Sequence, residues 1–180
     1  GIETPSLETT NELMRQCDLV LATGGGAMVH AAYSSGSPAL GVGVGNAVIT
    51  VDDTADLDAA AEKIRLSKTL DLAASCSSDN SVVLLDGIYE PMLEKLKAQG
   101  GYLCNEEEKA ALRNTLWDEE LHLNTAIVAQ PPEKIAQMAG LSIPEETKFF
   151  IVPEEGWGPE HPFSGEKLSV IMALYRARDI

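Results

Sequence analysis

Short apolar runs alternate with segments of helical spacing along almost the whole chain. The runs are apolar at successive positions rather than at every second one, which is typical of strands buried on both faces of a parallel sheet. We therefore expect an α/β fold in which helices flank a parallel sheet. The expected strands are residues 18–22, 38–42, 47–51, 82–85, 126–129, 149–152 and 170–175, and the expected helices are residues 6–16, 27–34, 57–70, 88–99, 106–116 and 131–139.

The chain carries a formal net charge of −15 over its 180 residues. Proteins that bind nucleic acid or anionic membrane surfaces carry basic patches, so we expect neither partner. No apolar run reaches the roughly 18 to 20 residues of a membrane span. The widely spaced cysteines Cys17, Cys76 and Cys104 form neither a disulfide framework nor a CxxC metal pair. We therefore expect a reducing, cytoplasmic location.

Three consecutive glycines, Gly24 to Gly26, follow the first expected strand and precede the helix at 27–34. This order of strand, glycine loop and helix presents backbone N–H groups to an anion. The stretch lacks the GxGxxG spacing of a dinucleotide site and the Lys-Ser/Thr pair of a P-loop. The residues alone leave two interpretations open, a phosphate site and a plain tight turn.

Cys76 lies in the segment ASCSSD, between the helix at 57–70 and the strand at 82–85. A cysteine at such a joint can be exposed at the edge of a sheet, where α/β proteins place their chemistry. Buried cysteines are nevertheless common, and they behave as small hydrophobic residues. Judged by its position alone, Cys76 is better interpreted as structural than as catalytic.

Longer segments carry a family resemblance. They are ATGGGAMVHAAYSSGSPALGVGVGN, VDDTADL, SKTLD, the segment around Cys76, HPFSGEKLS and ALYRARD. Together they resemble the aldehyde dehydrogenase superfamily, and within it the CoA-acylating branch, over nearly the whole chain. Similar members are the acetaldehyde dehydrogenase half of aldehyde–alcohol dehydrogenases and the acylating sulfoacetaldehyde and succinate-semialdehyde dehydrogenases. The resemblance implies a Rossmann-like catalytic domain of aldehyde dehydrogenase type.

The resemblance also implies a role for individual residues. Cys76 matches the catalytic nucleophile of the family, and Glu166 matches the glutamate that binds the nicotinamide ribose. Gly24 and Gly25 match the segment beside the cofactor pyrophosphate and nicotinamide, and Val42 matches a strand end that lies against the nicotinamide. These matches imply NAD or NADP as cofactor, coenzyme A as co-substrate and a small-molecule aldehyde as substrate.

Gly41 stands where the hydrolytic members of the family have the glutamate that activates water. Without a carboxylate to deprotonate water, an acyl-enzyme thioester survives until a thiol such as CoA attacks it. The resemblance thus implies an oxidoreductase that reversibly converts an aldehyde, CoA and NAD(P)+ to acyl-CoA and NAD(P)H through a thioester at Cys76. Acetaldehyde, sulfoacetaldehyde and succinate semialdehyde all stay open as the substrate.

Members of the family are much longer than this chain, so the resemblance places the chain across two domains. We expect residues 1–40 to be the C-terminal part of the cofactor-binding domain. Residues 41–180 are expected to be the catalytic domain, incomplete at its C-terminus. The full-length protein is expected to be a homo-oligomer, and the fragment alone to be inactive. The alternative is a non-catalytic, truncated relative that acts as an assembly or interaction module.

The remaining cysteines and the histidines suggest no further chemistry. The histidines are scattered without the spacing of metal ligands, so we expect no metal. Cys17 ends an amphipathic helix and Cys104 follows a turn, which indicates structural roles for both. His161 precedes Glu166 in the long loop at 153–164, and long loops in compact domains often contact ligands.

Overall fold

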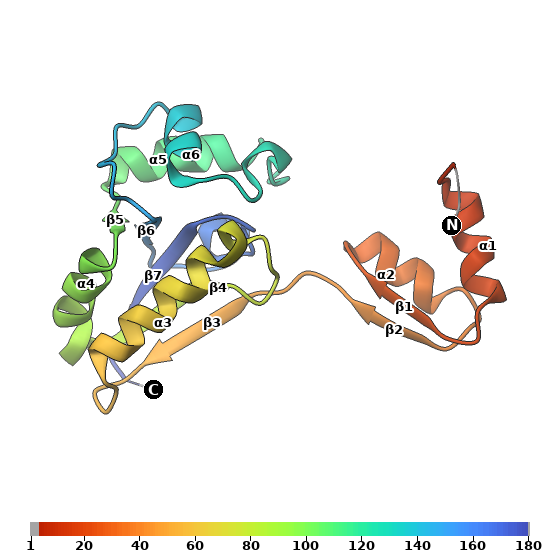
Figure 1. The fold of residues 1–180 in the computed structure, drawn as a ribbon, viewed down its shortest axis with the longest axis horizontal. Coiled ribbons are helices and arrows are strands. Elements are labelled where there is room, and N and C mark those ends of the chain that lie inside the picture. Colours follow the sequence, from red (N-terminus) through yellow and green to blue (C-terminus); the bar gives the residue numbers. More distant parts are fainter. Residues whose placement is uncertain (1–3, 180) are drawn as a thin grey trace. The chain divides into compact units, whose positions relative to one another are not determined.

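The structure of the chain, a computed structural model, describes residues 4–179 (Figure 1). The chain divides into two compact units, the first ending at Gly45 and the second beginning at Asn46. This division lies five residues beyond the boundary expected after residue 40. The reason is that β2 (Ala39–Val42) pairs with β1 (Val20–Thr23), which keeps the whole of β2 in the first unit.

The first unit is a parallel pair of strands with helices against one face. α1 (Leu7–Gln16) and α2 (Gly26–Tyr33) supply the helical layer. Its core consists of four buried side chains, Met14, Val20, Ala22 and Ala32. Because side chains alternate between the faces of a strand, the opposite face leaves Leu21 and Leu40 largely exposed.

The second unit is a five-stranded, all-parallel sheet in the order β3-β4-β7-β6-β5. Its strands are β3 (Ala47–Val51), β4 (Asp79–Leu85), β5 (Gly101–Leu103), β6 (Phe149–Pro153) and β7 (Ile171–Ala177). Its helices are α3 (Leu57–Thr69), α4 (Tyr89–Ala98), α5 (Glu106–Leu116) and α6 (Pro132–Ala139), with short 3₁₀ turns η1 (Leu70–Ala73), η2 (Asp86–Ile88), η3 (Thr125–Ile127) and η4 (Pro162–Ser164). The α/β class and the parallel sheet expected from the apolar runs are confirmed.

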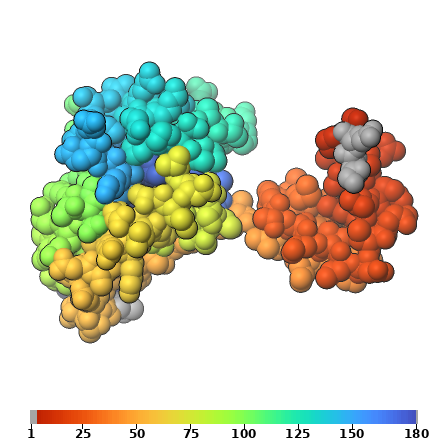
Figure 2. Space-filling view, viewed as in Figure 1, coloured from red at the N-terminus to blue at the C-terminus, as the bar shows by residue number. Residues whose placement is uncertain are grey.

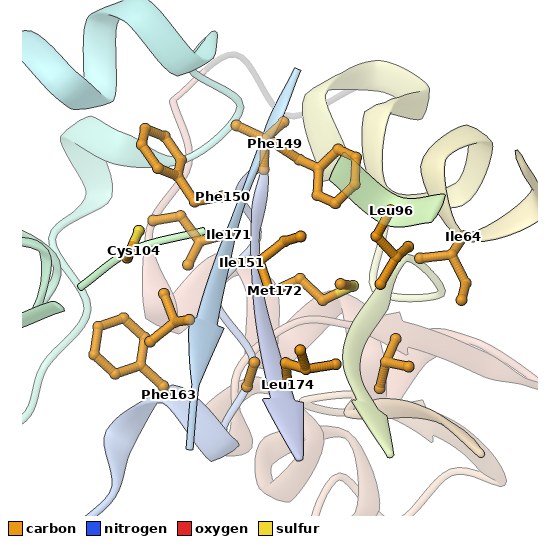
Figure 3. Close-up of a cluster of buried hydrophobic side chains, with 14 of the residues drawn as sticks. Ile64, Leu96, Cys104, Phe149, Phe150, Ile151, Phe163, Ile171, Met172 and Leu174 are labelled. Atoms are coloured by element: carbon orange, nitrogen blue, oxygen red, sulfur yellow. The ribbon is translucent and has the colours of Figure 1, made fainter. Parts of the chain in front are cut away.

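Buried side chains fill both faces of this sheet. Ile151 and Met172 lie on the side of Ile64 and Leu96, which belong to α3 and α4 (Figure 3). On the other face of the sheet, Phe150 packs in the same core as Leu112 of α5 and Ile135 of α6. The space-filling view shows that the dark blue β7 is almost wholly hidden, as expected for a strand in the middle of a sheet (Figure 2).

Polar side chains define where several helices begin. Asp56 accepts hydrogen bonds from the N–H groups of Asp58 and Ala59 at the start of α3. At the start of α5, Asn105 and Glu108 form a reciprocal capping box. Such caps satisfy N–H groups that have no partner inside the helix, typically at about 1 kcal/mol each. Across residues 4–179 no helix is both long enough and apolar enough to cross a membrane.

Two expectations about the second unit are wrong. The apolar run at 126–129 is not a strand, because the Asn124 side chain accepts a hydrogen bond from Ala126 N–H and closes the turn η3. The second error concerns β5, which lies where we expect the turn before Cys104. Gly101 allows this short strand to lie close to its neighbours, since a Cβ atom there would be 2.6 Å from Ile151 Cδ1.

Candidate active site

Cys76 is an exposed residue in the loop between η1 and β4. Ser78 N–H donates to Ser75 O over 3.0 Å, which makes Cys76 and Ser77 the central residues of a β-turn. The hydroxyl groups of Ser75 and Ser77 lie 2.8 Å apart and add a second contact across the turn. The nucleophile expected from the resemblance therefore lies on a hydrogen-bonded turn that is open to solvent.

The backbone before this turn is strained. Asp71, Leu72 and Ala73 have successive φ angles of 49°, 52° and 58°, in the left-handed region that costs roughly 1–2 kcal/mol for each non-glycine residue. Such strain persists only where surrounding packing holds it. Ala73 supplies that packing, because it is 1% exposed. The chain thus changes direction sharply after α3, and Cys76 lies just before β4, which starts at Asp79.

The position of Cys76 before β4 places it at the amino-terminal edge of the parallel sheet. Ligands of open α/β sheets usually bind at the carboxyl ends of strands. Cys76 therefore lies at an edge of the sheet, as expected, but at the amino-terminal edge rather than at the carboxyl-terminal edge where ligands usually bind. Asn46 precedes β3, and Glu166 precedes β7, so both lie toward the same edge as Cys76.

Side-chain amides connect the segments at this edge. Asn80 Nδ2 donates to Asn46 Oδ1 over 2.7 Å and to Gly165 O over 2.6 Å. Asn46 Nδ2 in turn donates to Ser164 O over 2.9 Å. The network links the starts of β3 and β4 to the segment that carries Glu166. Sequence reasoning missed both asparagines, because residues 34 and 118 positions apart show no local pattern.

Three of the expected cofactor residues meet in the first unit. Gly24 N–H donates to Val42 O over 3.0 Å, where β1 and β2 end. Gly25 is the N-cap of α2 and has no side-chain cap, and a Cβ atom added there meets nothing within 4 Å. Backbone N–H groups at a helix start beside open space suit the pyrophosphate of a dinucleotide. These residues therefore fit the cofactor that the resemblance implies.

Gly41 lies in β2 with its α-carbon against α2. A Cβ atom at this position would be 2.7 Å from Val29 Cγ1 and 2.7 Å from Tyr33 Cε2. Gly41 N–H also donates to the Tyr33 hydroxyl over 3.0 Å. The glutamate of hydrolytic relatives could be accommodated here only if these two side chains moved, so packing opposes a larger residue at position 41.

Two buried lysines lie behind the amino-terminal edge. Lys68, in the last turn of α3, is 1% exposed, and burial lowers its pKa to about 7 although Asp79 acts in the opposite direction. Burial also raises the pKa of Asp79, and Ser67 and Lys68 only partly oppose this shift. Desolvation thus outweighs mutual attraction in this pair. Lys167 is the second lysine and is fully buried.

Replacing Lys68 with methionine is expected to raise the free energy of unfolding of the second unit. The pKa of the amine is 10.5 when unfolded and about 7 when folded, so protonation opposes folding below pH 10.5 and does so fully below pH 7. The gain should be at most a few kcal/mol near pH 7, because Asp79 loses the favourable charge of Lys68, and it should shrink toward pH 10. Urea unfolding of both variants at pH 6, 8 and 10 measures it. A gain independent of pH would contradict the assignment.

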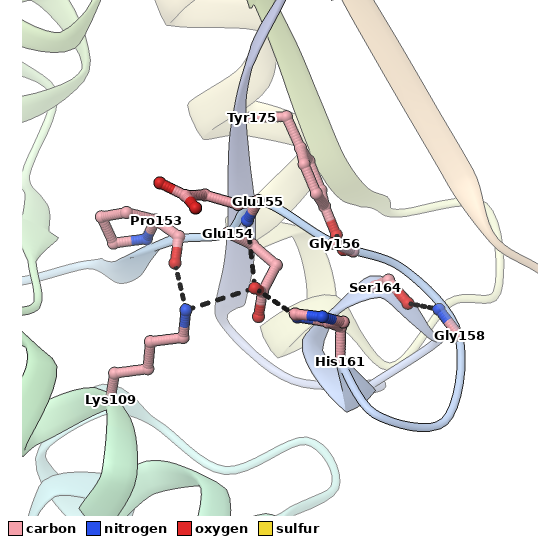
Figure 4. A network of polar contacts seen from close by, with 9 residues as sticks. All are labelled: Lys109, Pro153, Glu154, Glu155, Gly156, Gly158, His161, Ser164 and Tyr175. Carbon is pink, nitrogen blue, oxygen red and sulfur yellow. Dashed lines mark hydrogen bonds and ion pairs between the residues drawn. The ribbon is translucent and has the colours of Figure 1, made fainter.

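A separate polar network lies after β6 (Figure 4). Glu154 Oε1 contacts His161 Nδ1 over 2.9 Å and Lys109 Nζ over 3.3 Å, beside a cavity of about 420 Å³. Burial acts to raise the pKa of Glu154, but hydrogen bonds from His161 and Glu155 N–H and the charge of Lys109 lower it overall. His161 therefore has a structural partner inside its own loop.

The remaining cysteine expectations agree with the structure. Cys104 belongs to the core of the second unit, and burial raises the pKa of its thiol to about 12. Cys17 is half-buried at the end of α1 and packs against the core of the first unit. Within residues 4–179 no three His, Cys, Asp or Glu side chains form a group that could hold a metal ion.

Comparisons with known proteins agree with one another. The bifunctional aldehyde-alcohol dehydrogenase of Escherichia coli K12 is 45% identical over 99% of this chain, and the acylating sulfoacetaldehyde dehydrogenase of Cupriavidus necator is 47% identical over 97%. The chain spans only 20% and 36% of these two proteins. No family model matches the chain.

Solved structures give the same result. The acetylating aldehyde dehydrogenase of Geobacillus thermoglucosidasius superposes with a TM-score of 0.94 at 41% identity, covering 98% of this chain and 39% of that one. The propionaldehyde dehydrogenase of Rhodopseudomonas palustris, solved with bound CoA and an acylated cysteine, superposes with a TM-score of 0.86 at 26% identity, covering 97% of this chain and 40% of that one. In sequence and in fold, the chain belongs to the CoA-acylating aldehyde dehydrogenases.

Proposed function

We propose that the chain carries the nucleophile of an NAD(P)-dependent, CoA-acylating aldehyde dehydrogenase. The observation that carries the proposal is Cys76, exposed on a hydrogen-bonded turn in a chain that matches acylating enzymes over nearly its whole length. The similar enzyme of Rhodopseudomonas palustris has a cysteine that becomes acylated and a site that binds CoA. Both properties support the same roles here.

The proposed reaction begins at the sulfur of Cys76. The thiolate adds to the aldehyde carbonyl, which forms a C–S bond and an oxyanion that backbone N–H donors, including that of Cys76, stabilise. A bound nicotinamide cofactor supplies the hydride acceptor that turns this adduct into a thioester. The CoA thiolate then attacks the thioester carbonyl, and Cys76 leaves as a thiolate. Acyl-CoA, NAD(P)H and one proton are the products.

Four residues are proposed to hold the cofactor. Gly24 and Gly25 offer backbone N–H groups to the pyrophosphate, and Val42, at the end of β2, lies against the nicotinamide. Glu166 accepts hydrogen bonds from the nicotinamide ribose. The fit of the open helix start at Gly25 supports the first of these roles. The assay described below distinguishes NAD from NADP as the cofactor.

Gly41 supports transfer to CoA rather than to water. General-base activation of water needs a carboxylate, and the position that the resemblance assigns to it is Gly41, where a larger side chain fits only if Val29 and Tyr33 move. A thiol needs less activation, because a larger fraction of it is ionised near neutral pH. The acyl group on Cys76 is therefore expected to wait for CoA.

The product of the complete reading frame is the material for the functional test. Purified enzyme is mixed with NAD+ or NADP+, with and without CoA, and with acetaldehyde, sulfoacetaldehyde or succinate semialdehyde in turn. We expect reduced cofactor to form with at least one aldehyde, and to form continuously only when CoA is present. Absence of turnover with all three aldehydes, or turnover that ignores CoA, would contradict the proposal.

The alternative of a non-catalytic assembly module is not favoured, because the similar proteins are enzymes and the nucleophile position holds a cysteine. All three cysteines are free thiols, which fits the reducing, cytoplasmic location that we propose. Homo-oligomerisation of the complete protein stays a prediction from the resemblance.

A further inference from the structure

Lys167 is a fully buried amine whose hydrogen bonds all go to backbone. Its Nζ donates to Phe163 O over 2.5 Å, to Gly165 O over 3.0 Å and to Asn80 O over 3.3 Å. The three carbonyls surround the nitrogen, so every N–H group that it carries has an acceptor. Two of the carbonyls belong to the segment immediately before Glu166, and the third belongs to β4.

Burial of this amine is unfavourable by itself. Desolvation lowers the pKa of Lys167 well below its usual value, and the nearby Lys68 adds repulsion, while Glu154 acts in the opposite direction. An apolar side chain of similar volume would avoid this cost. What distinguishes the lysine from an apolar residue at this position is therefore its three hydrogen bonds to backbone carbonyls.

The backbone on either side of Lys167 is constrained by further contacts. Leu168 follows with a φ of 45°, a left-handed value that a leucine adopts only under constraint, and its carbonyl accepts from Ala129 N–H over 3.1 Å. Asn80, which belongs to β4, donates its side-chain N–H to Gly165 O. Glu166, which is half-buried, lies between these two fixed points.

We propose that Lys167 is the positioning residue of the cofactor site: by binding the carbonyls of Phe163, Gly165 and Asn80, it fixes the backbone that presents Glu166 to the nicotinamide ribose. The proposal rests on the proposed function only for what Glu166 binds. The fixing of the segment is a property of this chain alone. Lys167 itself touches neither aldehyde nor cofactor.

The kinetic test compares Lys167→Met with Lys68→Met in the product of the complete reading frame. Methionine keeps the volume and removes the donors, and Lys68 is the matched control because it is buried to the same degree. For Lys167→Met we expect the KM for NAD(P)+ to rise at least about tenfold, because a displaced binding group loses its alignment. The rate of Cys76 alkylation by iodoacetamide should stay within about twofold of the wild-type rate, since the nucleophile turn is untouched.

A purely structural role gives a different result. Alkylation and cofactor use would then change together, or Lys68→Met would raise the KM for NAD(P)+ as much as Lys167→Met does. Either outcome overturns the proposal. Lys167→Gln, which keeps two N–H donors on a shorter side chain, should give an intermediate KM and serves if the methionine variant does not fold.

Hydrogen exchange separates this proposal from the proposed function. In the 180-residue chain, the amides of residues 163–168 should exchange faster in Lys167→Met than in the wild type, while those of β6 keep their protection. Unchanged exchange at 163–168 overturns the positioning role, whatever the enzyme assay shows. If exchange rises but the wild-type enzyme has no CoA-dependent turnover, the proposed function fails and the positioning role stands.

Discussion

Replacing Cys76 with serine is expected to lower CoA-dependent NAD(P)H formation at least about 10³-fold, because loss of an enzyme nucleophile usually costs that much or more. No His or Lys lies beside position 76 in sequence to activate a serine hydroxyl at this exposed turn. The turn itself should persist, since its hydrogen bonds involve Ser75, Ser77 and Ser78 rather than the sulfur. Initial rates of the product of the complete reading frame measure the effect.

Cys17→Ser is the matched control for this substitution. It removes a thiol from the other unit, where Cys17 is half-buried at a helix end, and it should leave the rate within about twofold of wild type. The melting temperature of each variant separates lost chemistry from lost folding. An active Cys76→Ser enzyme, or equal losses in both variants, would contradict the assignment of the nucleophile.

Introducing a carboxylate at position 41 is expected to divert the acyl group from CoA to water. The double substitution Gly41→Glu with Tyr33→Ala removes one of the two side chains that a Cβ atom would meet. Release of free acid in the absence of CoA should rise by about 10²-fold, the lower part of the range for a general base. Single-turnover assays that quantify free acid against acyl-CoA measure the partition.

Gly41→Ala with Tyr33→Ala is the control, because it changes the packing without adding a carboxylate. Gly41→Ala alone should destabilise the first unit by about 1–3 kcal/mol, the usual cost of forcing an extra carbon into a packed site. If the double variant with glutamate folds and still passes its acyl group only to CoA, the lack of a carboxylate does not explain the preference for CoA.

Local patterns were sufficient for most of the fold. The consecutive apolar residues of β6 and β7 indicated strands buried on both faces, and the structure places both inside the sheet. The run at 126–129 is also apolar at successive positions, but its first residues belong to the 3₁₀ turn η3, because a neighbouring asparagine caps it. Strand β5 is three residues long and begins with glycine, so it offers no periodicity to detect.

The site was predictable only in part. Cys76, Glu166 and the glycines at 24–25 follow from family resemblance, and their roles stay proposals. Asn80 and Lys167 could not be recognised beforehand, because each acts through contacts between β4 and a segment more than 80 residues away. A buried lysine in a sequence looks the same as a surface lysine. Only the fold shows that its partners are backbone carbonyls.

Mass spectrometry of Cys76 tests the central claim most directly. The product of the complete reading frame is incubated without CoA with the aldehyde and the cofactor that give turnover in the assay above, digested at low pH, and compared with a sample to which CoA is then added. We predict an acyl thioester on the peptide that contains Cys76, which disappears on addition of CoA as acyl-CoA appears. An adduct on Cys17 or Cys104 instead, an unmodified Cys76, or loss of the thioester equally fast in buffer alone would contradict it.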